Sequence, residues 1–275
     1  EFIARFSANL SKSRQATSRK KILEKLTVDQ IKPSSRRYPY IEFKFEKDVG
    51  NDVLSVKGLS CAVDDTVMFR DFSLTLHKGD RIAFLGRNDL ARTTLFQVLT
   101  GGLKAETGSF KWGETVNVAY FPKDFGPFFD CDLDIINWLG QYSKVKDESF
   151  LRSFLGKMLF SGEDVFKKVK VLSGGERVRC MLSRMMLQAG NVLVLDEPTN
   201  HLDLESITAL NEGLERYPGT LMIASHDHQI LQTVANRIIE ITPSGVIDKP
   251  HHTLDEYLQS ETIKRQRESL YGSAV

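Results

Sequence analysis

Residues 191–203 read NVLVLDEPTNHLD, an apolar run that ends in two acidic residues. NVLVL is apolar at every position but the first, which indicates a strand that is covered on both faces of a sheet. TLMIAS at 220–225 and NRIIEI at 236–241 repeat this character, with helix-like segments between them. This alternation predicts an α/β core with a parallel sheet. In open sheets of this kind, functional residues collect at the carboxyl ends of the strands.

Asp196 and Glu197 follow the apolar run directly. At the edge of a sheet, one such carboxylate can hold a hydrated Mg²⁺ and the next can orient an attacking water. Acidic residues at a strand end are often only turn or cap residues, but the continuation PTNHLD is far more specific. With it, the chain resembles the ATP-binding cassette (ABC) ATPases. The resemblance implies that Asp196 is the Walker B aspartate and that Glu197 is the catalytic glutamate.

A second motif, LSGGE at residues 172–176, precedes the helix-like run RVRCMLSRMML. Ser173 and two glycines at a helix N-terminus would present a hydroxyl and N–H groups to an anion. Ser173 and Glu176 also have the S-x-x-E spacing of a capping box, and the two interpretations are compatible. In ABC proteins this is the signature motif, which the resemblance implies contacts the γ-phosphate of ATP held by the other cassette of a head-to-tail pair. The predicted signature residues are Leu172, Ser173, Gly174, Gly175 and Glu176.

His226 stands just after the strand-like run TLMIAS. A histidine at a strand end is commonly a surface or cap residue, but it can also donate a hydrogen bond to a phosphate oxygen. Its position after the Walker B-like strand is similar to that of the ABC switch histidine, so the resemblance implies a catalytic role beside Glu197. His228, His251 and His252 match no motif, and we expect them on the surface.

The stretch GRNDLARTT at residues 86–94 lies between the strand-like RIAFL and the helix-like LFQVLTGG. We predict a helix from Thr93 to about Thr100. A phosphate-binding loop at this place would carry a second glycine and a lysine, where this chain has Ala91 and Arg92. Because the other three motifs follow in the ABC order, the resemblance identifies this stretch as the Walker A loop.

Several substitutions in and around this loop affect nucleotide contacts. Asp89 places a carboxylate where phosphates would sit, and Arg92 is planar and bulkier than the lysine it replaces. Val63 stands where the family carries an aromatic residue that stacks on adenine, and Lys123 stands where it carries a glutamine that senses Mg²⁺ and the γ-phosphate. We expect nucleotide binding by this loop to be weak or lost; the alternative is that Arg92 and Thr93 still support it. The predicted nucleotide-binding residues are Gly86, Arg87, Asn88, Asp89, Leu90, Ala91, Arg92, Thr93, Thr94 and Lys123, and the predicted metal ligands are Thr93 and Asp196.

Short strand-like runs broken by turn residues begin near Asp52, with HKGD and TGS as predicted turns. Residues 133–166 mix helix-like pieces with glycines and charges, which predicts a small helical lobe. The resemblance implies an α/β fold: an ABC-type nucleotide-binding domain with a RecA-like parallel-sheet core, an antiparallel β subdomain and a small helical subdomain at about 128–187. The predicted cassette spans residues 52–250, and a C-terminal helical tail follows at 251–275.

The net charge of +1 conceals a segregation of charge along the chain. Residues 1–37 carry ten Lys and Arg against three Asp and Glu, a net of +7, so the remaining residues sum to −6. Within this segment, RQATSRKKILEKL predicts a basic helix and IKPSSRRYPY a proline-broken linker. The segment either forms a solvated helix at a chain end or contacts a polyanion such as RNA. The clustering of positive charge favours contact with a polyanion. The chain opens without an initiator Met, which suggests a fragment of a longer protein.

Cysteine usage and hydropathy bear on the compartment. Cys61, Cys131 and Cys180 are odd in number and lack metal-ligand spacing, which favours free thiols in a reducing compartment. The sequence contains no apolar run of about 18 residues and no signal-peptide core. We therefore predict a cytoplasmic protein without a direct membrane partner.

PTNHLD together with the basic segment 1–40 resembles the ABC-F subfamily. Its members are soluble proteins with two cassettes on one chain, joined by a long basic helical linker, and they act on the ribosome in translation. The resemblance implies that residues 1–40 end the linker and 52–250 form the second cassette. It also implies ATP and Mg²⁺ as cofactors, ATPase activity in the full-length protein, and as partners the first cassette of the same chain, the ribosome, tRNA and rRNA. Two alternatives are the nucleotide-binding subunit of a membrane transporter and a non-catalytic ribosome-binding scaffold.

Overall fold

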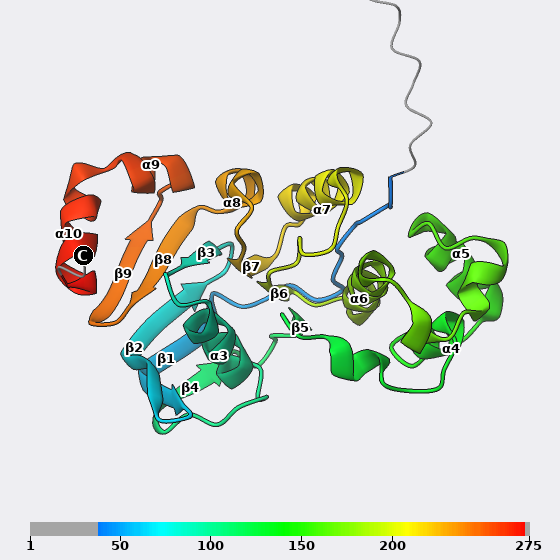
Figure 1. Ribbon diagram of the computed structural model, residues 1–275, viewed down its shortest axis with the longest axis horizontal. Helices are drawn as coiled ribbons and strands as arrows, with labels where there is room; N and C mark the ends of the chain where they lie inside the picture. Colours follow the sequence, from blue (N-terminus) through cyan, green and yellow to red (C-terminus); the bar gives the residue numbers. More distant parts are fainter. Residues whose placement is uncertain (1–37, 273–275) are drawn as a thin grey trace, which may run out of the picture. The chain divides into compact units, whose positions relative to one another are not determined.

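The computed structural model describes residues 38–272 of the 275-residue chain. The predicted linker helix within residues 1–37 lies outside the described residues, as do residues 273–275. The described part contains two sheets (Figure 1). The smaller sheet is antiparallel, with the strand order β2-β1-β4. Its strands are β1 (Asp52–Val63), β2 (Thr66–His77) and β4 (Thr107–Trp112).

The turn predicted at TGS is wrong, because these residues begin β4 and pair with β1. Gly108 has φ +82°, and a Cβ atom at this position would lie 2.3 Å from the carbonyl oxygen of Gly58. The register between the two strands shifts at this point. A glycine inside a strand often marks such a bulge or a close backbone approach, and here it marks both.

The larger sheet has the order β5-β6-β7-β3-β8-β9. Its first five strands are parallel, as predicted, and β9 adds an antiparallel edge that the sequence interpretation did not include. Every residue of β6 and β7 is buried, which confirms that these strands are covered on both faces. The strands are β3 (Arg81–Leu85), β5 (Val118–Phe121), β6 (Val192–Asp196), β7 (Thr220–Ala224), β8 (Arg237–Thr242) and β9 (Gly245–Pro250).

Alternate residues of the central strands enter two separate apolar cores. Val192 and Val194 of β6 pack with the smaller sheet and with helix α3 (Asp89–Leu99). Leu193 and Leu195 pack on the other side, with helices of the second half of the chain. Helix α3 contacts both β2 and β6, so it lies between the two sheets and ties the loop before it to both.

Helix α3 begins at Asp89, four residues before the predicted start at Thr93. Asn88 is its N-cap, with an extended backbone and a side chain that accepts hydrogen bonds from the first turn. Asparagine is among the best N-cap residues, because its side-chain oxygen replaces the missing backbone acceptors. Much of the predicted phosphate loop is therefore already helix.

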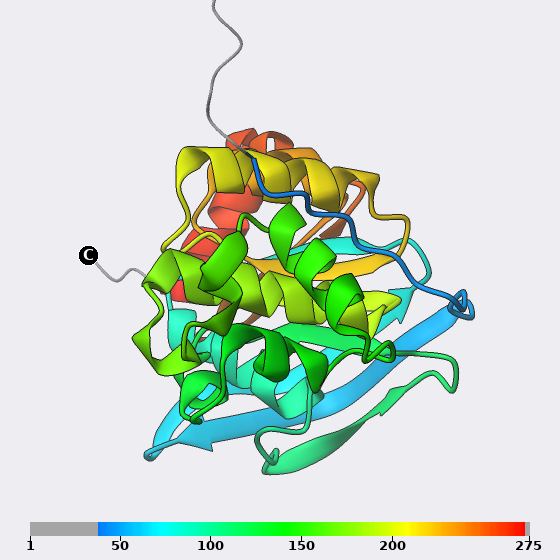
Figure 2. The same ribbon diagram turned by 90° about the vertical axis from the view of Figure 1, so that its right-hand side faces the viewer.

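The remaining helices cover the second face of the large sheet and both ends of the described part. Helices α4 and α5 lie at one end and α9 and α10 at the other (Figure 1 and Figure 2). No helix among residues 38–272 is long and apolar enough to cross a membrane. The α-helices are α4 (Ile135–Gly140), α5 (Glu148–Lys157), α6 (Gly174–Gln188), α7 (Leu204–Arg216), α8 (His228–Val234), α9 (Leu254–Gln259) and α10 (Glu261–Tyr271), and the 3₁₀ helices are η1 (Gly126–Phe129), η2 (Gly162–Phe166) and η3 (Val169–Val171).

Candidate nucleotide site

The loop that follows β3 starts with a glycine that no other residue could replace without a shift. Gly86 has φ +152°, and a Cβ atom there would lie 2.7 Å from the carbonyl oxygen of Ile241 on the neighbouring strand β8. Asn88 Oδ1 accepts hydrogen bonds from Leu90 N at 3.0 Å and from Ala91 N at 3.4 Å. Two N–H groups that a phosphate would need are therefore already bonded within the loop.

Arg92, which we predicted to replace the Walker A lysine, turns its guanidinium into the loop. Its side chain is only 4% exposed. Nη1 donates to the Gly86 carbonyl at 3.1 Å, and Nη2 donates to Asp89 Oδ1 at 2.6 Å and to Glu197 Oε1 at 3.2 Å. The positive charge expected to bind phosphate is thus paired with two carboxylates of the chain itself.

Three basic side chains surround the carboxylate of Asp89. Besides the Arg92 contact, Asp89 Oδ2 lies 3.1 Å from His226 Nε2 and 3.4 Å from Lys123 Nζ. Burial on its own would raise the pKa of Asp89, but the hydrogen bond to His226 and the nearby positive charges outweigh it and lower the pKa. From the sequence we expected the Asp89 carboxylate to repel phosphates. The structure adds that neighbouring side chains compensate this charge.

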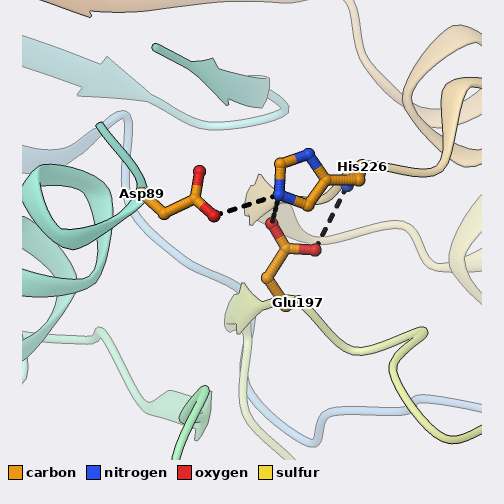
Figure 3. A group of neighbouring side chains, drawn as sticks. All are labelled: Asp89, Glu197 and His226. Carbon is orange, nitrogen blue, oxygen red and sulfur yellow. Dashed lines mark hydrogen bonds and ion pairs between the residues drawn. The ribbon is translucent and has the colours of Figure 1, made fainter. Parts of the chain in front are cut away.

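Glu197 and His226 meet at the carboxyl ends of β6 and β7 (Figure 3). Glu197 has a left-handed backbone with φ +52°, and its N–H donates to the carbonyl of Ala224 on the next strand at 2.8 Å. Its carboxylate accepts the backbone N–H of His226 at 3.2 Å, and His226 Nε2 lies 3.4 Å from its other oxygen. Asp89, Glu197 and His226 therefore form one cluster whose ligand atoms all lie within 4.8 Å of one another.

Buried oxygen atoms without partners lie beside this cluster. Burial raises the pKa of Asp196 to about 6, although the nearby Thr93 hydroxyl and Lys123 moderate the rise. No hydrogen bond of good geometry joins Thr93 to Asp196, and Thr93 Oγ1, Thr94 Oγ1 and Asp196 Oδ2 are all buried without a partner. Oxygen atoms of this kind are the ligands that Mg²⁺ prefers. Thr93 and Asp196 therefore fit the predicted magnesium site.

The predicted signature segment, residues 172–176, lies at the N-terminus of α6. Ser173 is the N-cap, and its N–H and hydroxyl both donate to Glu176 Oε2 at 2.8 Å, while Glu176 N donates to Ser173 Oγ at 3.4 Å. The capping box is confirmed. Ser173 is exposed, and Gly174 packs so closely against His201 that a Cβ atom would lie 3.0 Å from the imidazole ring. Among residues 38–272, none of the hydrogen bonds or ion pairs links this segment to the loop at 86–94.

One contact of the loop carried no signal in the sequence. Tyr271, near the end of α10, accepts a hydrogen bond from Arg87 N at 3.3 Å, and the Arg87 guanidinium lies over its ring at 4.3 Å. The Tyr271 hydroxyl donates to Glu240 Oε1 at 2.7 Å. The loop is therefore held by a helix about 180 residues further along the chain, outside every motif.

Comparisons with known proteins agree with this arrangement. A family model described as ABC transporter matches residues 69–200, and a second model with the same description matches residues 1–43. The chain contains an ABC ATP-binding domain. This domain is similar in fold to a solved structure described as a metal-chelate type ABC transporter in an inward-facing conformation, with a TM-score of 0.62, 18% identity, and coverage of 80% of this chain and 89% of that one. The expected ABC nucleotide-binding fold, with its parallel core, antiparallel β subdomain and small helical subdomain, is confirmed.

Three curated relatives illustrate how far the similarity extends. The chain is 58% identical over 274 residues to the ABC transporter ATP-binding protein YkpA of Bacillus subtilis, which is described as uncharacterized, covering 99% of this chain and 51% of YkpA. It is 42% identical to YbiT of Escherichia coli O157:H7, described as a probable ATP-binding protein, covering 96% of this chain and 50% of YbiT. It is 30% identical to ABC transporter F family member 5 of Arabidopsis thaliana, covering 98% of this chain and 40% of that protein. The chain therefore spans about half the length of YkpA and YbiT.

Proposed function

We propose that this chain is the second ATP-binding cassette of a soluble, cytoplasmic ABC-F protein that couples ATP binding and hydrolysis to an interaction with the ribosome and tRNA. In this proposal the chain acts mainly as the donor of a signature motif to an ATP site on a first cassette. The similarity to an F family member and to relatives about twice as long supports the two-cassette arrangement.

The observation that carries the proposal is the internal pairing of the phosphate loop. Arg92 is buried against Glu197 and Asp89, and the first N–H groups of α3 are bonded to Asn88. Incoming phosphates would have to displace these contacts. Breaking the buried carboxylate–guanidinium pair would leave the Glu197 carboxylate buried without its partner, which is costly. Nucleotide binding at this loop is therefore weak, even though Glu197 and His226 are in place.

The predicted signature segment, by contrast, has an exposed serine whose hydrogen bonds lie within one capping box and not in a buried ion pair. The hydroxyl of exposed Ser173 lies at the positive end of a 15-residue helix, where backbone N–H groups and the helix dipole favour an anion. To bind a phosphate, the Ser173 hydroxyl would exchange its exposed hydrogen bond to Glu176, and no buried pair would be broken. Such a segment can contact the outer phosphate of ATP that another cassette holds.

Within its own site, the chain's residues have separable roles. Thr93 and Asp196 would hold Mg²⁺, which neutralises phosphate charge when it is bound. Glu197 would orient the attacking water, and His226 would donate to a phosphate oxygen. The role of Glu197 requires Arg92 to release it first, because the carboxylate that would orient water is engaged by the guanidinium.

The basic segment 1–40 supports the ribosomal part of the proposal through its charge. A net of +7 over residues 1–37 suits contacts with RNA phosphates, which weaken steeply as salt rises. If the segment binds tRNA or rRNA, affinity should fall linearly on a logarithmic salt scale, and removal of residues 1–37 should abolish that dependence.

The test compares ATP turnover in the full-length protein with Ser173→Ala or Thr93→Ala. We expect Ser173→Ala to reduce turnover at least about tenfold more than Thr93→Ala, the loss of a contact worth about 1.4 kcal/mol in the transition state. Thr253→Ala is the matched control, because Thr253 forms the same capping box with Glu256 at the start of α9. Equal losses for Ser173→Ala and Thr93→Ala would refute the donor role, and no loss in either would favour the non-catalytic scaffold.

A further inference from the structure

The Asp89 carboxylate is surrounded by groups that come from three distant parts of the chain. Arg92 belongs to the same helix, Lys123 follows β5 and His226 follows β7. All three direct nitrogen atoms to its two oxygens, at 2.6, 3.4 and 3.1 Å. These three positions correspond to the lysine, glutamine and histidine for which the family resemblance implies contacts with nucleotide phosphates. One carboxylate therefore takes up the donors of three phosphate-contacting positions.

A carboxylate and a terminal phosphate have related chemistry at such a place. Both are oxyanions that accept charge-assisted hydrogen bonds, and these are shorter and stronger than neutral ones. Asp89 is also the first residue of α3, where the helix dipole favours negative charge. The position thus combines the three features of an anion site: a helix N-terminus, a buried guanidinium and two further donors.

We propose that the Asp89 carboxylate is an internal substitute for the γ-phosphate, which holds Arg92, Lys123 and His226 in a ligand-engaged arrangement without nucleotide. This inference rests on the proposed function, and it explains how a site with weak nucleotide binding can keep its catalytic glutamate and histidine ordered. The half-site on this chain then stays in one arrangement throughout the ATP cycle. Nucleotide dependence is confined to the site on the other cassette.

The lowered pKa of Asp89 agrees with this role, because it keeps the carboxylate charged at neutral pH. Removing the charge would leave Lys123 without its carboxylate partner and Arg92 with Glu197 alone. A soluble oxyanion could then enter. The exchange of an internal anion for an external one is therefore the property to measure.

The experiment titrates tripolyphosphate into this chain and its Asp89→Asn, Asp89→Ser and Asp89→Glu variants. Tripolyphosphate carries phosphates without adenine, so the predicted loss of adenine stacking at Val63 does not affect the measurement. We expect both uncharged variants to bind it at least about tenfold more tightly than the parent chain, and to gain several degrees in Tm at saturating ligand. Asp89→Glu retains the charge and should bind as weakly as the parent.

The control is Asp124→Asn, which removes a nearby carboxylate that caps Gly126 N at 2.9 Å and takes no part in the cluster. A gain in Asp124→Asn as large as in Asp89→Asn would show only a general charge effect and would overturn the inference. So would equal affinity in Asp89→Asn, Asp89→Ser and the parent. The outcome is separate from the Ser173 test, because it is measured on one cassette and needs no ATP turnover.

Discussion

Replacing Arg92 with alanine should destabilise the fold more than almost any other single change in the site. The side chain of Glu197 is 1% exposed, and it forms an ion pair with the similarly buried side chain of Arg92, which is 4% exposed. A unit-charge pair at 3.2 Å attracts by about 5 kcal/mol at an effective dielectric constant of about 20. Removing one partner of such a pair typically costs about 3–5 kcal/mol, because the other charge is left uncompensated.

Urea denaturation at pH 7 measures this cost directly. We expect Arg92→Ala to lower the free energy of unfolding by about 3–5 kcal/mol, and the double variant Arg92→Ala/Glu197→Gln to recover more than half of the loss. Arg152→Ala is the control, because Arg152 forms an exposed pair with Glu148 that should be worth less than about 1 kcal/mol. A loss below about 1 kcal/mol for Arg92→Ala would refute a buried ion pair at the centre of the loop.

Three further predictions concern stability, each read from denaturation curves. Burial raises the pKa of Asp196 from 3.8 to about 6, so the protonated carboxyl contributes fully to stability below pH 3.8, and this contribution is lost as pH rises through about 6. Asp196→Asn should therefore raise the free energy of unfolding by about 2–3 kcal/mol at pH 7 and leave it unchanged near pH 3. A gain that does not depend on pH would contradict the assignment. Tyr271→Phe removes the hydroxyl that donates to buried Glu240 and should cost about 1–3 kcal/mol; no loss would mean that α10 does not hold the loop. Gly108→Ala should cost about 2–4 kcal/mol because of its φ and the close Gly58 carbonyl, whereas Gly156→Ala, with no atom within 4 Å, should be neutral or stabilising by up to about 1 kcal/mol.

The parts of the fold that local sequence determines were predictable. Strands β6 and β7 are continuous apolar runs, and burial on both faces needs no more information than that. The capping box at Ser173 is equally local, because both of its residues lie within one turn. The start of α3 was also readable, since Asn88 is a strong N-cap, but the phosphate-loop template placed the helix too late.

Long-range pairing explains what the sequence interpretation missed. TGS has the composition of a turn, yet pairing with β1 makes it a strand, so tertiary context overrode local propensity. The Arg87–Tyr271 contact joins residues 184 positions apart and has no periodic or motif signal. The substitution at Asp89 was visible, but its compensation by Lys123 and His226 depends on how β5 and β7 lie beside the loop.

Isothermal titration of Mg·ATP into this chain tests most directly whether internal ion pairs occupy its predicted phosphate loop. The internal pairing of Arg92, Asp89 and Glu197 predicts no saturable binding tighter than about 1 mM, because ATP must break a buried ion pair before it gains any phosphate contact. A dissociation constant in the micromolar range would contradict this, and would show that Arg92 and Thr93 still form a working Walker A site.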